Sequence, residues 1–109
     1  MKRIIEEVIY IYLTKNHRGK NNLIKNKELR KLFNIKDDKT MREIIQNIRE
    51  NEEYTEIIGS ISGKSGGYYT CIDELEVKET INNIKHRAKE MLKMCKILEK
   101  KMEVSKWKI

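Results

Sequence analysis

The 109-residue chain contains no proline, only two cysteines and no long apolar run. Cys71 and Cys95 cannot make the disulfide framework of a small secreted domain, so a reduced setting is the simpler interpretation. No stretch approaches the roughly 18 apolar residues that a membrane span requires. Glu6 and Glu7 interrupt the apolar N-terminal segment, which argues against a signal peptide. We therefore expect a cytoplasmic protein with no membrane partner.

The groupings that catalysis or metal binding requires are also missing. His17 and His86 have no cysteine or histidine at zinc-site spacing, and no nucleophile stands with a base. The segment from Gly59 to Ser65 superficially resembles a phosphate-binding loop. Three residues separate its glycines where that motif has four, and an extended run follows instead of a helix. We expect no enzyme activity, no catalytic residues, no cofactor and no metal.

Charge is what the sequence has in abundance. Charged residues make up 38% of the chain, and the formal net charge is +7. Ten basic and three acidic residues fall in 15–42, two and eight in 43–76, and ten and four in 77–109. Two basic blocks separated by an acidic one favour a localised contact with a polyanion over non-specific binding across the whole surface.

Apolar periodicity predicts three short helices in the first half of the chain. The first covers residues 3–15, the second begins at an N-cap at Asn26, and the third is capped by Asp37 or Asp38 and ends near Glu50. Between the first two, residues 23–25 are either a connector or a very short strand. The residues at helical spacing are Ile5, Val8, Ile9, Tyr12, then Leu29, Leu32, Phe33, then Met41, Ile44, Ile45, Ile48.

Two β-type runs, residues 57–61 and 68–72, flank a loop rich in glycine and serine, which is typical of a hairpin with a flexible tip. Within the second run, Tyr68 and Tyr69 alternate faces. We expect one of them to pack in the core and leave the other free to reach a DNA backbone.

From Asp73 onward the pattern is that of one long helix. Its apolar residues alternate by four and three, a strict heptad: Val77, Ile81, Ile84, Ala88, Met91, Cys95, Leu98 and Met102. A helix of about 28 residues spans about 42 Å, longer than the domain it would cover. We predict that it pairs with a second copy and buries the Cys95 thiol; packing on its own domain is the alternative. The predicted division is therefore a domain at 1–72 and a dimerisation helix at 73–109.

The order helix, short extended piece, helix, turn, helix, hairpin is typical of a winged helix-turn-helix. The predicted fold class is mainly α (α+β), with the helix-turn-helix at 26–50, a two-stranded β-hairpin wing around 62–67, and the long C-terminal helix. In such a fold the polar side of the third helix is free to enter a major groove about 12 Å wide.

The segments Met41–Arg49, Ile57–Ser60 and Gly66–Tyr69 resemble the winged-helix module of biotin-repressor-like regulators. Over nearly the whole chain, the sequence is similar to small winged-helix proteins of phages and prophages of low-GC Gram-positive bacteria. The resemblance implies a DNA-binding regulator or a replication accessory protein.

The helical projection of the third helix assigns four base-facing residues: Lys39, Arg42, Glu43 and Gln46. Arginine pairs with guanine, glutamine with adenine, and glutamate accepts from cytosine. The expected phosphate contacts, which position the protein without reading sequence, are Lys25, Lys27, Arg30, Lys31, Thr40 and Lys64.

The expected function is sequence-specific binding of double-stranded DNA by a homodimer that regulates phage or prophage transcription. The alternative is a protein–protein adaptor or replication accessory factor without sequence-specific DNA binding, acting through the acidic 50–56 region or the long helix. Fold alone does not separate the two.

Overall fold

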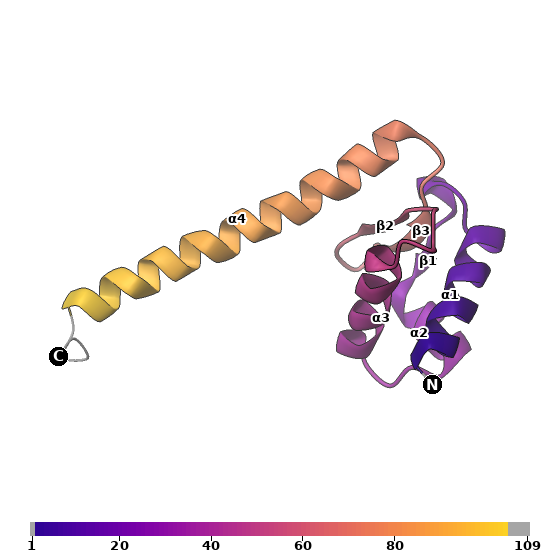
Figure 1. Ribbon diagram of the computed structural model, residues 1–109, viewed down its shortest axis with the longest axis horizontal. Helices are drawn as coiled ribbons and strands as arrows, with labels where there is room; N and C mark the ends of the chain where they lie inside the picture. Colours follow the sequence, from indigo (N-terminus) through magenta and orange to yellow (C-terminus); the bar gives the residue numbers. More distant parts are fainter. Residues whose placement is uncertain (1, 105–109) are drawn as a thin grey trace.

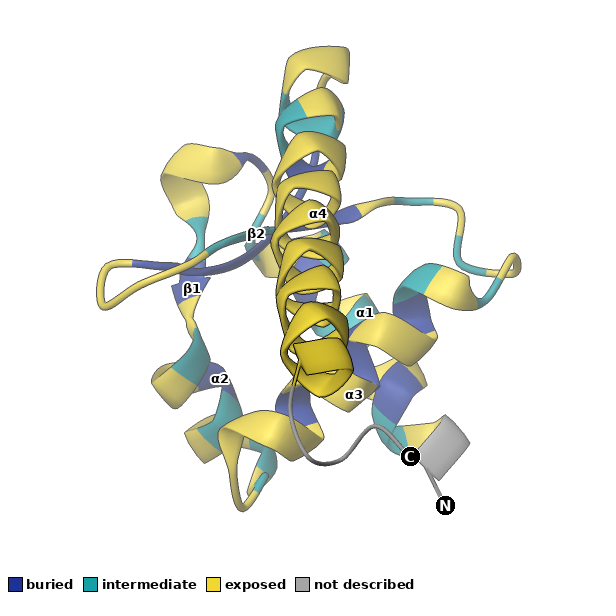
Figure 2. Cartoon of the chain, turned by 90° about the vertical axis from the view of Figure 1, so that its left-hand side faces the viewer, coloured by how far each residue is buried: buried dark blue, intermediate teal, exposed yellow. Residues whose placement is uncertain are grey.

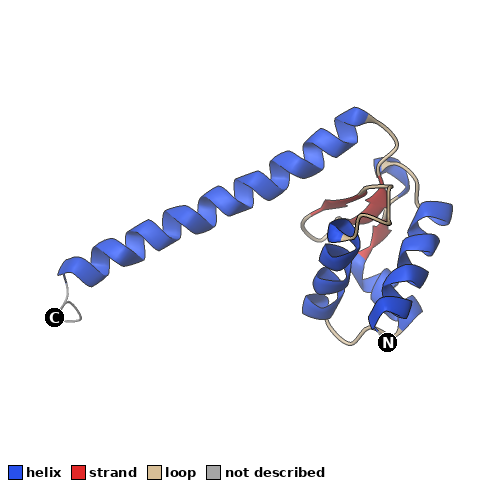
Figure 3. Ribbon diagram, viewed as in Figure 1, coloured by secondary structure: helices blue, strands red, loops and turns tan. Residues whose placement is uncertain are grey.

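Helices and one small antiparallel sheet make up the computed structural model, which describes residues 2–104 (Figures 1 and 3). This is the mainly helical α+β class with a long final helix that the sequence predicts. Along the chain the elements are α1 (Lys2–Asn16), the 3₁₀ turn η1 (Lys20–Asn22), β1 (Ile24–Lys25), α2 (Asn26–Phe33), α3 (Asp38–Glu50), β2 (Ile58–Ile61), β3 (Gly67–Thr70) and α4 (Glu74–Val104).

The sheet has three strands in the order β1-β3-β2. The hairpin β2–β3 pairs Gly59 with Tyr69, close to the predicted runs. Segment 23–25, left open between a connector and a strand, supplies the two-residue strand β1, which pairs Ile24 with Tyr68. The sheet is therefore one strand wider than the two-stranded hairpin expected from the sequence.

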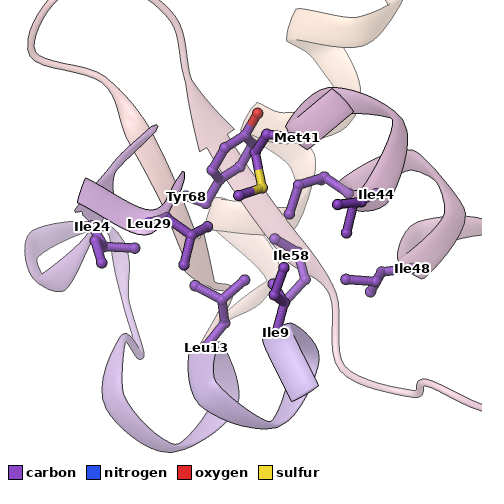
Figure 4. Close-up of a cluster of buried hydrophobic side chains, with 10 residues drawn as sticks. Ile9, Leu13, Ile24, Leu29, Met41, Ile44, Ile48, Ile58 and Tyr68 are labelled. Atoms are coloured by element: carbon purple, nitrogen blue, oxygen red, sulfur yellow. The ribbon is translucent and has the colours of Figure 1, made fainter. Parts of the chain in front are cut away.

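The core lies where α1, α2, α3 and the sheet meet (Figure 4). The predicted stripe of α3 is confirmed, because all four of its apolar residues are buried. On α1 three of the predicted residues, Ile5, Ile9 and Tyr12, pack in or against the core, whereas Val8 is 43% exposed and Leu13, which was not predicted, is fully buried. Buried Glu6 lies on the same helix and accepts a 2.8 Å hydrogen bond from Asn47 of α3.

Short polar side chains set the ends of α2 and α3. Asp37 caps α3 by accepting from the Thr40 amide at 2.8 Å, one of the two predicted caps. That hydrogen bond lowers the pKa of the Asp37 carboxyl. Asn34 ends α2 in the left-handed conformation, with φ at 56°.

Asn26, predicted as the N-cap of α2, is instead its first residue, and Lys25 holds the cap position without a side-chain hydrogen bond. The Asn26 amide donates to Asp38 at 2.8 Å and to the Tyr68 hydroxyl at 3.3 Å. Its oxygen accepts from Arg30 at 2.6 Å. One residue therefore joins the first turn of α2 to the first turn of α3 and to β3.

Both tyrosines of β3 are buried, so the expectation that one reaches outward is wrong. Tyr68 packs into the core beneath α3. Tyr69, on the other face, lies near Thr80 of α4 and over Gly59, where an added Cβ would come within 2.5 Å of its ring. Burial raises the pKa of both hydroxyls. The start of α4, which local patterning could not place, covers the second face.

The first two turns of α4 are anchored to the domain. Glu76 accepts from the Lys20 and Ile72 amides at 2.8 and 3.0 Å, and Glu79 pairs with the Lys20 ammonium at 3.0 Å. Thr80 is buried, with its hydroxyl 4.0 Å from the Cys71 sulfur. Beyond Thr80 the helix leaves the domain and extends into solvent (Figure 1).

Candidate nucleic-acid interface

The outward face of α3 holds all four predicted base-facing residues in exposed positions. Because the apolar residues of α3 lie on the side of the helix that faces the core, the polar residues between them lie on the opposite side. Lys39 and Thr40 lie in the first turn, Arg42 and Glu43 follow, and Gln46 lies one turn further along. The structure therefore brings the predicted set together on one surface of a single helix.

A cleft of about 920 Å³ opens in front of this face. Its walls are α3, the β2–β3 hairpin and, on the third side, Ile84 and Arg87 of α4. Viewed along α4, the helix passes in front of α3 and β2 (Figure 2). In Figure 1 it diverges from α3 with distance from the hairpin. The sequence did not predict that α4 would bound the space that a ligand of α3 must enter.

Charges of both signs line the cleft, and two of the predicted base-facing residues already have partners on α3. Arg42 forms an ion pair with Asp38 at 3.2 Å, and Gln46 donates to Glu50 at 3.2 Å. The Arg42–Asp38 pair is more than half exposed on both sides. Exposed pairs of this kind contribute at most about 1 kcal/mol, so a competing ligand can displace them at little cost.

Arg49 is the main polar residue of α3 that sequence reasoning missed. Its guanidinium donates to the Ile58 carbonyl at 2.8 Å and to the Ser60 hydroxyl at 3.0 Å. Burial lowers its pKa, a sign that the group is held inside the structure. Arg49 therefore fastens the end of α3 to β2. Its signal in the sequence is weak: it flanks buried Ile48, on the border between the two faces of the helix.

The predicted phosphate-contacting residues divide into those beside the cleft and those away from it. Lys25 is exposed on β1 opposite Gly67, and Lys64 is exposed in the hairpin loop. Lys27 and Thr40 are exposed in the first turns of α2 and α3.

Two further members of that set are placed differently. Arg30 is half-buried, with its Nε donating to Asn26. Lys31 lines a separate cleft of about 370 Å³ with Tyr12 and His17. Lys25, Lys27, Thr40 and Lys64 are thus exposed on elements next to the α3 cleft, whereas Arg30 is half-buried and Lys31 lines a different cleft.

The predicted dimerisation residues form an exposed series along α4. Val77 is half-buried where the helix meets the domain, and the others are exposed: Ile81, Ile84, Ala88, Met91, Cys95, Leu98 and Met102. Cys95 is a free, exposed thiol in the single chain, and Cys71 is a free, buried one. Burial raises the pKa of the Cys71 thiol, which disfavours the reactive thiolate.

Comparison with protein families, curated proteins and solved structures finds no match to this chain. Within residues 2–104, no helix has the length and apolar character to cross a membrane. The same part of the chain holds no group of three or more His, Cys, Asp or Glu side chains placed to bind a metal ion. Interpretation of the function therefore depends on the geometry of the exposed surfaces.

Proposed function

We propose that the chain is a winged helix-turn-helix protein that binds double-stranded DNA in a sequence-specific manner. In this proposal α2 and α3 are the helix-turn-helix and the β2–β3 hairpin is the wing. The role is that of a transcriptional regulator of the phage or prophage type, as the resemblance of nearly the whole chain to small phage and prophage winged-helix proteins implies.

The observation that carries the proposal is the exposed polar face of α3, which lies in a cleft between the start of α2, a glycine-rich hairpin and α4. An α-helix with its side chains fits a major groove about 12 Å wide. Exposed lysines flank this face at β1, α2 and the hairpin loop, where the backbone of a bound duplex would pass. Asn26 fixes the relative position of α2 and α3, so the two helices would approach the duplex as one unit.

Base contacts in this proposal concentrate in the first half of α3. Lys39, Arg42 and Glu43 lie there, whereas the end of α3 is fastened to β2 by Arg49. Arg42 has the length and planar donors for bidentate pairing with guanine. Leaving Asp38 would cost it only an exposed ion pair.

The test is binding of the full chain to a mixed-sequence duplex across a salt series, followed by selection of a preferred site from random duplexes. Each phosphate contact adds about 0.9 to the slope of log K against log salt. We expect a steep negative slope and a selected motif. The matched variants are Lys64→Ala beside the cleft and Lys93→Ala on exposed α4. A salt slope that is shallower for Lys64→Ala and unchanged for Lys93→Ala supports the proposal. If the unmodified chain does not bind the duplex at low salt, the proposal is contradicted.

The adaptor function is the second candidate, and one observation favours it. Acidic residues stand among the basic ones at the cleft, and Glu52 and Glu53 are exposed just beyond α3. An acidic edge repels phosphate and suits a basic protein surface. The adaptor interpretation predicts that neither the unmodified chain nor a Glu52→Lys, Glu53→Lys variant binds a mixed-sequence duplex at low salt. A rise in duplex affinity favours DNA.

A further inference from the structure

The outer part of α4 is exposed along its length (Figure 2), and many of its exposed residues are apolar. Every residue from Ile81 to Val104 is exposed. Met91, Leu92 and Leu98 expose 69%, 63% and 57% of their surface. Isolated helices are marginal in water, because most helix stability in proteins comes from packing of an apolar face. We therefore expect another surface to pack against this segment, and the order of its side chains indicates which one.

The heptad assigns each residue of this segment a place relative to a partner helix. Apolar residues separated alternately by three and four follow a 3.5-residue period, which winds like helices around each other. The a positions are Ile81, Ala88, Cys95 and Met102, and the d positions are Val77, Ile84, Met91 and Leu98. Parallel helices pair a with a and d with d, whereas antiparallel helices pair a with d.

Side-chain volume distinguishes the two orientations. In a parallel pair, Ala88 meets Ala88 and Cys95 meets Cys95, so two neighbouring a layers contain only small side chains. In an antiparallel pair every small a residue meets a larger d residue. Layers that combine large with small side chains fill the space between helices, and underfilled layers cost stability. The volumes therefore favour the antiparallel orientation.

The flanking positions favour the same orientation independently. The e positions read Lys85, Leu92, Glu99, and antiparallel helices place e against e. When the second helix runs in the opposite direction, Lys85 of each helix faces Glu99 of the other, and Leu92 faces Leu92. A parallel pair would instead place each e residue against a preceding g residue, which sets Leu92 against Arg87 and Glu99 against Met94.

One register satisfies both sets of positions. When the two-fold axis passes level with Lys93, Met91 faces Cys95 and Ala88 faces Leu98 in the core. Leu92 then meets its own copy on one flank, and Met94 meets its own copy on the other. The pairing of Arg87 with Lys101 is the unfavourable contact, and it falls on exposed side chains where salt screens it. Sliding one helix by one heptad sets Lys85 against Leu92 instead.

We propose that α4 pairs with a second copy of itself as an antiparallel two-helix coiled coil centred at Lys93. The two domains then lie at opposite ends of a rod. Thr80, the last buried residue of each α4, is about 13 residues from the centre, so the two copies are about 39 Å apart along the axis at 1.5 Å per residue. Because Ile84 also lines the cleft in front of α3, the part of the partner helix near Met102 would lie at that wall of the cleft. The pairing itself can be tested without DNA.

The test is disulfide trapping between two differently sized full-length chains. Both carry Cys95→Ser and keep buried Cys71; one also carries Ala88→Cys, and the other, extended by an N-terminal tag, carries Leu98→Cys. The chains are mixed in a glutathione buffer and separated without reductant. Disulfides need Cα atoms within about 7 Å. We expect the mixed-size dimer to exceed either same-size dimer at least tenfold, whereas dominant same-size dimers would establish the parallel orientation and overturn the proposal.

A second measurement keeps the proposal testable without any new cysteine. Light scattering on the unmodified full-length chain should give the mass of a dimer. Leu98→Glu should reduce it to that of a monomer, while Lys93→Glu, on the outer f position, should leave it unchanged. A monomeric mass for the unmodified chain at high micromolar concentration would overturn the proposal and leave the exposed face to a different partner. Neither measurement includes DNA, so failure here is distinct from failure of DNA binding.

Discussion

The two parts of the molecule use their apolar residues in opposite ways. Up to Thr80 the chain buries a core of apolar residues against its own helices and sheet, as Ile9 and Ile45 show, although some, such as Ile4, stay exposed. From Ile81 onward a helix of similar composition buries none of them. The first part therefore folds by packing against itself, whereas the outer half of α4 has an apolar face that only another chain can cover. The first turns of α4, up to buried Thr80, contact the domain and belong to the first part in this respect.

The largest expected effect comes from opening the domain core. Ile45→Ala removes a side chain that is 1% exposed, and a change of this kind costs about 2–5 kcal/mol of unfolding free energy. The matched change, Leu98→Ala on exposed α4, should leave the domain's urea transition within about 0.5 kcal/mol at submicromolar concentration, where a weak dimer dissociates. Equal losses for both variants would contradict the division of the molecule into two parts.

A smaller effect is expected from the proposed base-reading residue. Arg42→Ala should weaken binding to a selected duplex by about 1–3 kcal/mol and relax preference at one base pair. Binding is measured by fluorescence anisotropy on the selected site and on single-base variants of it. Lys93→Ala serves as the control on the other part of the molecule. A uniform loss across all sequences would reassign Arg42 to a phosphate contact.

The hairpin loop should contribute affinity without specificity. Lys64→Ala removes one exposed positive charge, and should reduce the salt slope of duplex binding by about one while leaving the order of preferred sequences unchanged. The slope is measured between about 50 and 200 mM salt. An altered sequence preference would mean that the loop reads bases.

The smallest effect is expected at the cap of α3. The pKa of Asp37 is lowered in the folded chain, so its stabilising contribution is present above the unfolded carboxyl pKa of about 3.9 and disappears as pH falls through the folded value. Asp37→Ala should therefore lower the melting temperature slightly at pH 7. The difference from the unmodified chain should shrink progressively below about pH 4, as followed by circular dichroism. A constant difference down to pH 2 would indicate that the carboxylate charge is not involved.

Local patterns in the sequence predicted the elements, because helix periodicity and caps depend on neighbours within a few residues. The buried stripe of α3 and the cap at Asp37 are examples. The three contacts missed, by Asn26, Arg49 and Tyr69, each join segments that only tertiary packing brings together. The same holds for the candidate site: one helix face could be predicted from spacing, but the third wall of the cleft, from Ile84 and Arg87, depends on the direction in which α4 leaves the sheet.

The most direct test of the central claim is the mapping of amide chemical shifts on the isotopically labelled full chain during titration with a selected duplex. The account predicts perturbations concentrated at Lys39, Arg42 and the hairpin loop around Lys64, with residues 50–56 little changed. Perturbations confined to 50–56, or none at duplex concentrations well above those of the protein, would contradict it.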